Sequence, residues 1–480
     1  MFDRVFSGQV IRPMWGCLCC EPQTLGFSAQ AITQATAIAP EAAAAHWIMP
    51  PLANAHDHAR GVKPTALAAF DLPLEMWLAV MSGTPVADPW LVVANALGRQ
   101  ALSGCGSIMV HYTRPQDPAR IAFELREVTR AARTVGVRIA LAVALRDVNA
   151  LGYAPDETIL AALPPEVAQA VRSRLLGRPM PFADQLRLVE DLAAELDDPL
   201  VDVQYGPYGL EWCSDAMLRL IAERSALTGR RVHMHLLESP VQRAYLDATF
   251  PQGPLRYLDE IGLLSPRLSV GHAAHLRPGE MALLAERGVA VSINTSSNLN
   301  LRNGVAPAAE MYRQGVRLVT GLDGFTVDDD DDALRELRLN WMLHRGLGAQ
   351  EGWPLPALMR AATLEGRAIL GGGLDAAPLS PGAMADLLVL RRDAQDLLLP
   401  AEEAPLLAQR ATARHVRSLV VAGREVVAEG RLTGLDLDAA RAELDAQCRV
   451  GAGAAIAWRQ VATGYAEGLR DFYAAALPRG

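Results

Sequence analysis

The feature that most constrains this chain is a repeated alternation of short apolar runs with amphipathic segments, which begins near residue 46. The amphipathic segments carry apolar residues at the three-to-four-residue spacing of a helix with one buried face. Eight apolar runs read as strands: Trp47–Asn54, Ser107–Tyr112, Val137–Leu145, Val201–Tyr205, Arg231–Leu236, Leu268–His272, Val289–Asn294 and Val316–Leu322. Eight strand–helix units in succession predict an α/β fold, a (β/α)8 TIM barrel.

The segments between the runs begin and end as helices do. Five of them have clear helical spacing: Ala119–Val135, Phe182–Leu196, Ser214–Thr228, Pro278–Arg287 and Ala306–Gln314. Glycines that can cap such helices stand just before the next run: Gly136, Gly229, Gly288 and Gly315. An open doubly wound sheet shares this alternation, but it requires a glycine-rich phosphate turn after the first strand. The first run leads instead into Asn54-Ala55-His56-Asp57-His58, which favours the barrel.

Both ends of the chain lie outside this alternation. The first ~45 residues and a later turn-rich region contain alternating stretches typical of strands, such as Ala385–Leu390 and Ser418–Val427. We therefore predict a small β-sandwich domain formed from both ends of the chain. The predicted divisions are 1–45 and 376–435 for the β-sandwich, 46–375 for the barrel, and 436–480 for a helical C-terminal tail with an exposed end.

Composition excludes several classes of partner. The formal net charge is −9 and half of the residues are hydrophobic, as in an ordinary soluble protein without a basic surface for nucleic acid. The longest uncharged stretch, residues 22–40, contains too many polar side chains to cross a bilayer. We expect a small-molecule substrate, no nucleic acid and no membrane, and a homodimer as the commonest kind of oligomer.

The cysteines do not form the spaced pattern of a disulfide framework. Three of the six crowd into four residues, Cys17, Cys19 and Cys20. This pattern and the lack of a secretory signal predict a reducing compartment, the cytoplasm. The three clustered cysteines could seed a thiolate metal site, but no second pair of ligands follows at suitable spacing, so small residues in an irregular segment are the favoured interpretation.

Lysine is almost absent from the chain. Lys63 is the only lysine among 45 basic residues. Any chemistry that needs a lysine must therefore use Lys63 or be missing, including a phosphate-binding lysine, a Schiff-base lysine and the carbamylated lysine that bridges two metals.

Potential metal ligands stand at the ends of several predicted strands. His56 and His58 are two apart after the first run, so the period-two alternation of a strand sends both side chains to one face. His235 ends the fifth run, His272 ends the sixth, and Asp323 follows the eighth. Because these strand ends open onto one mouth in a TIM barrel, the sequence predicts a metal site there.

Three imidazoles and a carboxylate favour Zn²⁺, with Fe²⁺ as the second candidate. A divalent metal with one position open to water would lower the pKa of that water from 15.7 to about 7. A dinuclear site bridged by a carbamylated lysine would need that lysine after Val201–Tyr205, where there is none, and Lys63 follows the first run. We therefore expect one metal.

Two further residues near the fifth run have two interpretations each. Glu238 stands three residues after His235, where its carboxyl group could shuttle a proton, or where it could be an exposed acid in the first turn of the next helix. His233 alternates in phase with His235, so it is a ligand, a substrate contact or, as happens more often, a core histidine with its hydrogen bonds satisfied.

Five motifs resemble, in order and spacing, those of the amidohydrolase superfamily. They are Asn54-Ala55-His56-Asp57-His58 after Met49-Pro50-Pro51, the segment Val232–Glu238, Val270-Gly271-His272, Ser296-Ser297-Asn298, and Gly321-Leu322-Asp323-Gly324. The likeness is to the branch that contains cytosine, guanine and S-adenosylhomocysteine deaminases and triazine hydrolases. The segment Pro381–Val389 resembles the strand with which that family returns to its β-sandwich.

The resemblance implies that His56, His58, His235 and Asp323 bind the metal. It also implies that His272 orients the water or polarises the substrate, that Asp323 takes the proton of the water, and that Glu238 protonates a ring nitrogen or the departing amine. The implied reaction is hydrolytic deamination of an N-heterocycle of the purine, pyrimidine, pterin or triazine type. Hydrolysis of an alkylamine, amide or halide group on a related molecule is the alternative, and a non-catalytic binding barrel is a remote one.

Three residues are candidate substrate contacts. Trp77, next to Met76, falls on the loop after the first run, where it walls the pocket or packs beneath the loop. His111 ends the second run and faces the mouth, and Asn298 belongs to the Ser-Asn motif. Beyond the eighth run, the five carboxylates of Asp328–Asp332 form either a solvated loop that serves the next helix N-terminus or an electronegative mouth.

Overall fold

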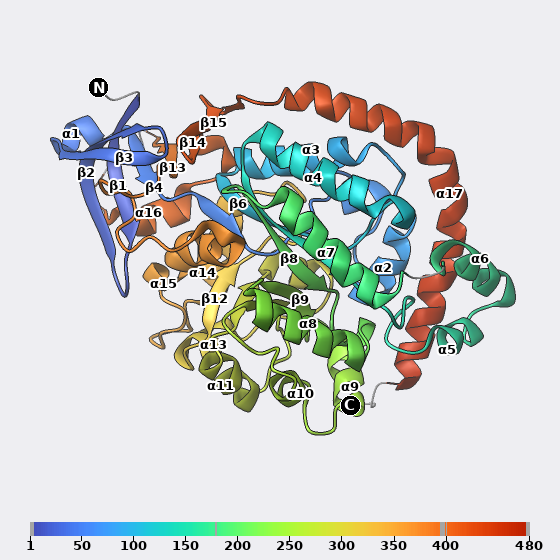
Figure 1. The fold of residues 1–480 in the computed structure, drawn as a ribbon. Helices are drawn as coiled ribbons and strands as arrows, with labels where there is room; N and C mark the ends of the chain where they lie inside the picture. Colours follow the sequence, from blue (N-terminus) through green and yellow to red (C-terminus); the bar gives the residue numbers. More distant parts are fainter. Residues whose placement is uncertain (1–3, 178–179, 394–398, 400, 477–480) are drawn as a thin grey trace.

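The computed structural model describes residues 4–177, 180–393, 399 and 401–476, and it contains two eight-stranded sheets (Figure 1). One of them is a parallel barrel in which each strand pairs with the next along the chain. Its strands are β5 (Leu52–Asn54), β6 (Cys105–Tyr112), β7 (Arg138–Leu145), β8 (Val201–Pro207), β9 (Val232–Leu236), β10 (Leu268–His272), β11 (Ala290–Ile293) and β12 (Arg317–Thr320). The predicted TIM barrel with a second β structure is confirmed.

Backbone hydrogen bonds close the seam between β5 and β12. The Ala55 N–H donates to the Thr320 carbonyl at 2.8 Å, and the Asp323 N–H donates to the His56 carbonyl at 2.9 Å. The seam therefore closes directly beside the residues predicted to bind the metal.

Helices surround the barrel, as Figure 1 shows. The main ones are α3 (Pro89–Leu102), α4 (Ile121–Val135), α7 (Phe182–Leu196), α8 (Asp215–Thr228), α9 (Pro240–Thr249), α10 (Pro254–Glu260), α11 (Pro278–Glu286), α13 (Ala308–Arg313) and α14 (Ala333–His344). Gly136 and Gly229 end α4 and α8 with φ of 96° and 73°, the left-handed conformation expected of a capping glycine.

Further helices and turns lie between these elements and beside the second sheet. They are α1 (Pro40–Ala43), α2 (Leu74–Met81), α5 (Asp156–Ala161), α6 (Pro165–Leu175), α12 (Thr295–Asn300), α15 (Leu355–Arg360) and α16 (Glu403–Arg410). Short 3₁₀ turns lie at Pro64–Leu67, Pro118–Arg120, Leu210–Trp212 and Ala413–His415, and π-helical turns lie at Ala361–Glu365 and Ala368–Gly372.

The first predicted strand, Trp47–Asn54, is wrong as a single element. Its first half belongs to β4 (His46–Met49) in the second sheet, and its second half is β5 in the barrel. Pro50 and Pro51 separate the two strands. Because proline has no backbone N–H to donate, consecutive prolines interrupt sheet pairing at this point.

The second sheet is mixed and draws strands from both ends of the chain. Besides β4 it contains β1 (Arg4–Pro13), β2 (Leu18–Ser28), β3 (Ala31–Ala37), β13 (Leu387–Arg391), β14 (Val416–Val421), β15 (Arg424–Ala428) and β16 (Arg431–Leu432). Trp47 on β4 pairs with β1 on one side and β13 on the other, so this strand joins the two ends. The second β unit is thus confirmed, whereas the exact domain divisions stay a prediction.

The clustered cysteines differ from their predicted setting. Cys19 and Cys20 lie in the regular strand β2 rather than in an irregular segment, and they are exposed, as is Cys17. All six cysteines are free.

The C-terminal region, expected to be helical, is one 40-residue helix, α17 (Leu437–Ala476). It runs along the outside of the barrel (Figure 1) and buries Trp458, Tyr465 and Tyr473. The Trp458 indole donates to the Ser82 hydroxyl at 2.7 Å, and the Tyr473 hydroxyl accepts from the Tyr153 N–H at 2.9 Å. Within the described part of the chain, no helix combines the length and the apolar character needed to cross a membrane.

Candidate active site

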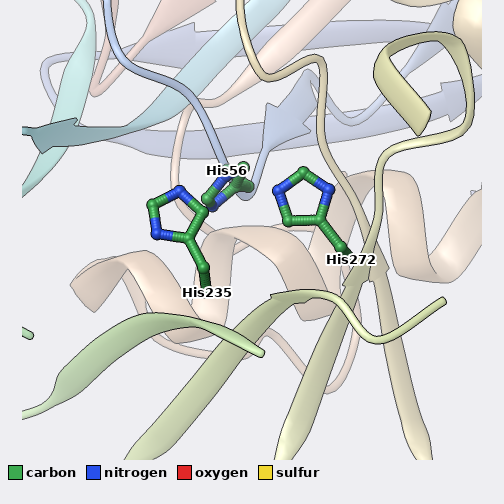
Figure 2. Close-up of side chains that lie close together, drawn as sticks. All are labelled: His56, His235 and His272. Carbon is green, nitrogen blue, oxygen red and sulfur yellow. The ribbon is translucent and has the colours of Figure 1, made fainter. Parts of the chain in front are cut away.

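The predicted metal ligands come together at the carboxyl ends of β5, β9, β10 and β12. The His58 Nε2 atom lies 3.0 Å from Asp323 Oδ1, and the His56 Nε2 atom lies 3.5 Å from the same oxygen. His235 Nε2 is 3.3 Å from His58 Nε2. Figure 2 shows the imidazoles of His56, His235 and His272 facing one another. The ligand atoms of these residues fall into groups of three that lie within 4.8 Å of one another.

The backbone determines which nitrogen of His58 and His235 carries the proton. His58 Nδ1 lies 2.7 Å from the His111 carbonyl, and His235 Nδ1 lies 2.6 Å from the Tyr208 carbonyl. A carbonyl only accepts, so both Nδ1 atoms are protonated and both Nε2 atoms present lone pairs. Two lone pairs 3.3 Å apart cannot form a hydrogen bond with each other. Both Nε2 atoms would therefore be available to bind a metal ion.

His56 is oriented by a buried relay. Its Nδ1 lies 2.6 Å from His233 Nε2, and His233 Nδ1 lies 2.7 Å from the Ser269 hydroxyl. Because Ser269 donates to the Val232 carbonyl, it accepts from His233, which in turn accepts from His56 Nδ1. His56 Nε2 is thus a third lone pair directed at the cluster. His233 has both nitrogen atoms satisfied, which confirms its interpretation as a core histidine.

The donor set fits a divalent metal. His56 Nε2 and Asp323 Oδ1 are buried and have no hydrogen-bond partner among the described residues. Burial lowers the pKa of His58 to about 4 and that of His235 well below its usual value. Neutral imidazoles whose other nitrogen is held by a carbonyl or a second histidine are the form that binds metals.

Asp323 supplies the negative charge of the cluster. Burial acts to raise its pKa, but the positive charge of Arg60, whose Nη1 lies 3.6 Å from Oδ1, helps to hold it well below the usual value. The Ser297 hydroxyl donates to Oδ2 at 2.6 Å, which leaves Oδ1 for the cluster. The backbone of Asp323 has a φ of 56°, which turns its side chain off the end of β12 toward the histidines.

Glu238 is buried beside this cluster, so the interpretation as an exposed first-turn acid is wrong. Its Oε1 accepts from Asn303 Nδ2 at 3.0 Å, and its Oε2 lies 3.5 Å from His272 Nε2. Burial first, and then the negative charge of Asp323, raise the pKa of Glu238 well above its usual value. A raised pKa favours the protonated form of this carboxyl group, the form that can donate a proton.

His272 faces both carboxyl groups of the site. Its Nε2 is 3.5 Å from Glu238 and 4.0 Å from Asp323 Oδ2, and it has no hydrogen-bond partner among the described residues. The Nδ1 atom is held by Asn298 Oδ1 at 2.8 Å. Burial lowers the pKa of His272 to about 3, so its Nε2 presents a lone pair toward the cluster.

The three candidate substrate contacts have different surroundings. Trp77 is buried, stacks on Phe325 and donates its indole N–H to the Ala69 carbonyl at 3.1 Å, which favours packing beneath the loop. His111 is buried against His58 and His235, and its Nε2 bonds the Gly206 carbonyl. Asn298 orients His272. A direct contact of any of the three with substrate stays a prediction.

Sequence reasoning missed four residues that support the site: Arg60, Tyr208, Ser297 and Asn303. Ser297 stood inside the Ser296–Asn298 motif, so its signal was present. Asn303 follows α12 and meets Glu238 across 65 positions of sequence, a contact that no local pattern indicates.

The aspartate run is tied to the rest of the fold by a helix cap and by ion pairs, and an electronegative mouth stays a prediction. Asp332 caps the N-terminus of α14 by accepting from the Leu334 and Arg335 N–H groups at 3.1 Å, as predicted. Asp331 is 1% exposed and pairs with Lys63 at 2.8 Å and Arg99 at 2.9 Å, so a fully solvated loop is wrong. The ion pair of Lys63 with Asp331 therefore joins the loop after β5 to the loop after β12.

A model of the amidohydrolase family matches residues 47–426 of the chain. The chain belongs to the amidohydrolase family. It is a hydrolase of carbon–nitrogen bonds other than peptide bonds, which confirms the prediction of an enzyme made from the motifs. Five motifs at the ends of barrel strands were therefore enough to recognise the family.

Curated relatives are named as deaminases. The chain is 27% identical over 398 residues to 5'-deoxyadenosine deaminase of Methanothermobacter thermautotrophicus, covering 81% of this chain and 84% of the relative. It is 30% identical over 417 residues to 5-methylthioadenosine/S-adenosylhomocysteine deaminase of Nitratidesulfovibrio vulgaris, covering 83% of each.

Solved structures share the fold. An adenosine deaminase from Xanthomonas campestris with bound zinc superposes with a TM-score of 0.73 at 23% identity, over 93% of this chain and 98% of the other. Atrazine chlorohydrolase from Arthrobacter aurescens, complexed with zinc, superposes with a TM-score of 0.75 at 20% identity, over 92% of this chain and 99% of the chlorohydrolase.

Proposed function

We propose that this amidohydrolase deaminates an adenosine-type N-heterocycle by hydrolysis, using one divalent metal held by His56, His58, His235 and Asp323. The observation that carries the proposal is the buried carboxyl group of Glu238, which lies 3.5 Å from His272 Nε2 and beside the unpaired ligand atoms of His56 and Asp323. The two relatives described above, both named as deaminases of adenine nucleosides, support the choice of substrate class.

The reaction replaces an exocyclic amino group by an oxygen from water and releases ammonia. A divalent metal held by these four residues would supply the acidity that lets water act as hydroxide near neutral pH. Asp323, ionised at Oδ2 and held by Ser297, accepts the proton that the water loses. Glu238 donates its carboxyl proton to the ring nitrogen or to the departing amine.

His272 completes the arrangement as a hydrogen-bond acceptor. With its Nδ1–H given to Asn298, its Nε2 can receive a hydrogen bond from the attacking water and fix the direction of attack. Burial of Glu238, His272 and Asp323 excludes bulk water and strengthens these polar interactions.

Zinc is proposed as the metal, with iron as the second candidate, because nitrogen-rich donor sets suit both. A reducing, cytoplasmic compartment is proposed from the six free cysteines. A homodimer stays a prediction from the frequency of dimers, and light scattering on the purified protein tests it.

Ammonia release from a substrate panel tests the function. The panel contains 5'-deoxyadenosine, adenosine, guanine, a pterin and an aminotriazine, with an alkylamino- and a chlorotriazine to test other leaving groups. We expect the highest kcat/KM with an adenine nucleoside. Turnover of the chlorotriazine or alkylaminotriazine alone would replace the proposal by the alternative, and no turnover by a metal-loaded protein would favour a binding barrel.

A further inference from the structure

We propose that Asp57, the residue between His56 and His58, is a positioning residue that holds this histidine pair in register with Asp323 across the barrel seam. The inference rests on the metal set of the proposed function, and it adds to that set a side chain that binds neither metal nor substrate.

The carboxylate of Asp57 bonds both sides of the seam. It is 0% exposed. Its Oδ2 accepts from the Gly324 N–H at 2.9 Å and from Asn54 Nδ2 at 2.8 Å, and its Oδ1 accepts from the Ala59 N–H at 2.7 Å. One side chain therefore connects the loop after β5, which carries both histidines, to the residue that follows Asp323.

Three consecutive backbone amides around Asp323 donate to the last residue of β5 and to the segment that follows it. The Leu322 N–H donates to Asn54 Oδ1 at 2.8 Å, the Asp323 N–H to the His56 carbonyl at 2.9 Å, and the Gly324 N–H to Asp57 Oδ2 at 2.9 Å. Two of these three bonds depend on side chains, Asn54 and Asp57, and Asn54 is itself anchored to Gln100 on α3 at 3.0 Å.

The seam needs this connection because regular strand pairing is sparse there. The strand β5 has three residues, and Asp323 and Gly324 have φ of 56° and 63°, outside the extended conformation of a strand. Asp323 Oδ1 must nevertheless lie close to both histidines at once, 3.5 Å from His56 Nε2 and 3.0 Å from His58 Nε2. Supporting hydrogen bonds of this kind keep ligands within the fraction of an ångström that a metal requires.

The chemistry requires a carboxylate rather than an amide. Asp57 receives three donors on its two oxygens, so both oxygens act as acceptors. In Asp57→Asn the amide nitrogen faces either the Ala59 N–H or the donors of Gly324 and Asn54. One donor then opposes another in either orientation, which loosens the seam without a change in side-chain volume.

The test compares Asp57→Asn with Asp147→Asn. The Asp147 carboxylate accepts from the N–H of Ser214 at 2.7 Å and from the hydroxyl of Ser214 at 2.6 Å. Asp147 therefore also joins two loops at this end of the barrel, but it does not contact the seam. Zn²⁺ affinity is measured by competition with a chromophoric chelator, and Co²⁺ absorption reports the ligand geometry. We expect a 10–100-fold weaker Zn²⁺ affinity and a changed Co²⁺ spectrum for Asp57→Asn, and wild-type values for Asp147→Asn.

Zn²⁺ affinity within twofold of wild type in Asp57→Asn, or an equal loss in Asp147→Asn, overturns the proposal. If Asp57→Asn does not fold, Asn54→Ser replaces it as the test variant, because this substitution removes the hydrogen bond to Gln100 and weakens the bond from the Leu322 N–H. An unchanged Zn²⁺ affinity in Asn54→Ser also overturns the proposal. A wild-type protein that binds no Zn²⁺ contradicts both proposals, whereas a wild type that binds Zn²⁺ and deaminates restricts any failure to Asp57.

Discussion

At the scale of single residues, the partner of each Nδ1 atom sets the chemistry of the site. His58 and His235 give their protons to carbonyls, and His56 gives its proton to His233. The sequence placed these ligands at strand ends, but it left His233 open, because the partner of each ring nitrogen depends on tertiary packing. Asn303 was missed for the same reason.

Replacing Glu238 by Gln should lower kcat/KM about 10²–10⁴-fold, because a general acid contributes that much and glutamine cannot donate a carboxyl proton. Bound metal should be unchanged, since Glu238 is not among the ligands. Steady-state ammonia release and metal analysis measure the two quantities. The control Glu336→Gln removes another buried carboxyl group and should retain activity; full activity in Glu238→Gln would remove Glu238 from the mechanism.

Replacing His233 by Leu should weaken Zn²⁺ binding about 10–100-fold, because His56 Nδ1 then loses the acceptor that fixes its orientation. Chelator competition measures the affinity. His344, a buried histidine on α14, offers a control, since His344→Gln should bind Zn²⁺ as the wild type does. Equal affinity in the two variants would contradict the role of His233.

Stability should depend on the protonation of Glu336. Burial raises its pKa to about 7 in the folded chain, above the usual 4.5, so the folded state binds the proton more tightly. The contribution of Glu336 to the free energy of unfolding is complete below pH 4.5 and is lost as the pH rises through about 7. The free energy of unfolding changes by up to about 3 kcal/mol over this range. Urea unfolding from pH 5 to 8 should show a steeper decline for wild type than for Glu336→Gln; parallel curves would contradict this.

At the scale of elements, most strands and helices followed from periodicity, because each barrel unit buries one face in a regular way. The exceptions have local causes. The run Trp47–Asn54 has no charged residue and is polar only at its last position, so hydropathy does not reveal that Pro50 and Pro51 divide it between two sheets. The helix α17 contains Gly451, Gly453, Gly464 and Gly468, each of which costs about 1 kcal/mol in a helix interior, yet packing against the barrel preserves it.

Replacing Tyr473 by Phe should reduce the free energy of unfolding by about 1–3 kcal/mol, because the buried Tyr153 N–H loses its acceptor. Chemical denaturation followed by circular dichroism measures the change. The half-exposed Tyr312 provides the control, as Tyr312→Phe should leave stability within about 0.5 kcal/mol of wild type. Identical stability of the two variants would mean that this contact does not anchor α17.

At the scale of the whole molecule, β4 unites the two ends of the chain by pairing with β1 and β13, only a few residues before His56, the first of the proposed metal ligands. The general plan was predictable from the order of motifs. The path of α17 along the barrel was not, because it depends on contacts between distant segments such as Trp458 with Ser82.

The most direct test of the central claim is ammonia release from 5'-deoxyadenosine as Zn²⁺ is added back to the metal-free protein. We predict that activity is absent without metal, rises linearly, and reaches its plateau at one equivalent per chain, because His56, His58, His235 and Asp323 form one site. His235→Ala should show no such rise. Activity in the metal-free protein, or a plateau at two equivalents, would contradict a hydrolase with a single metal.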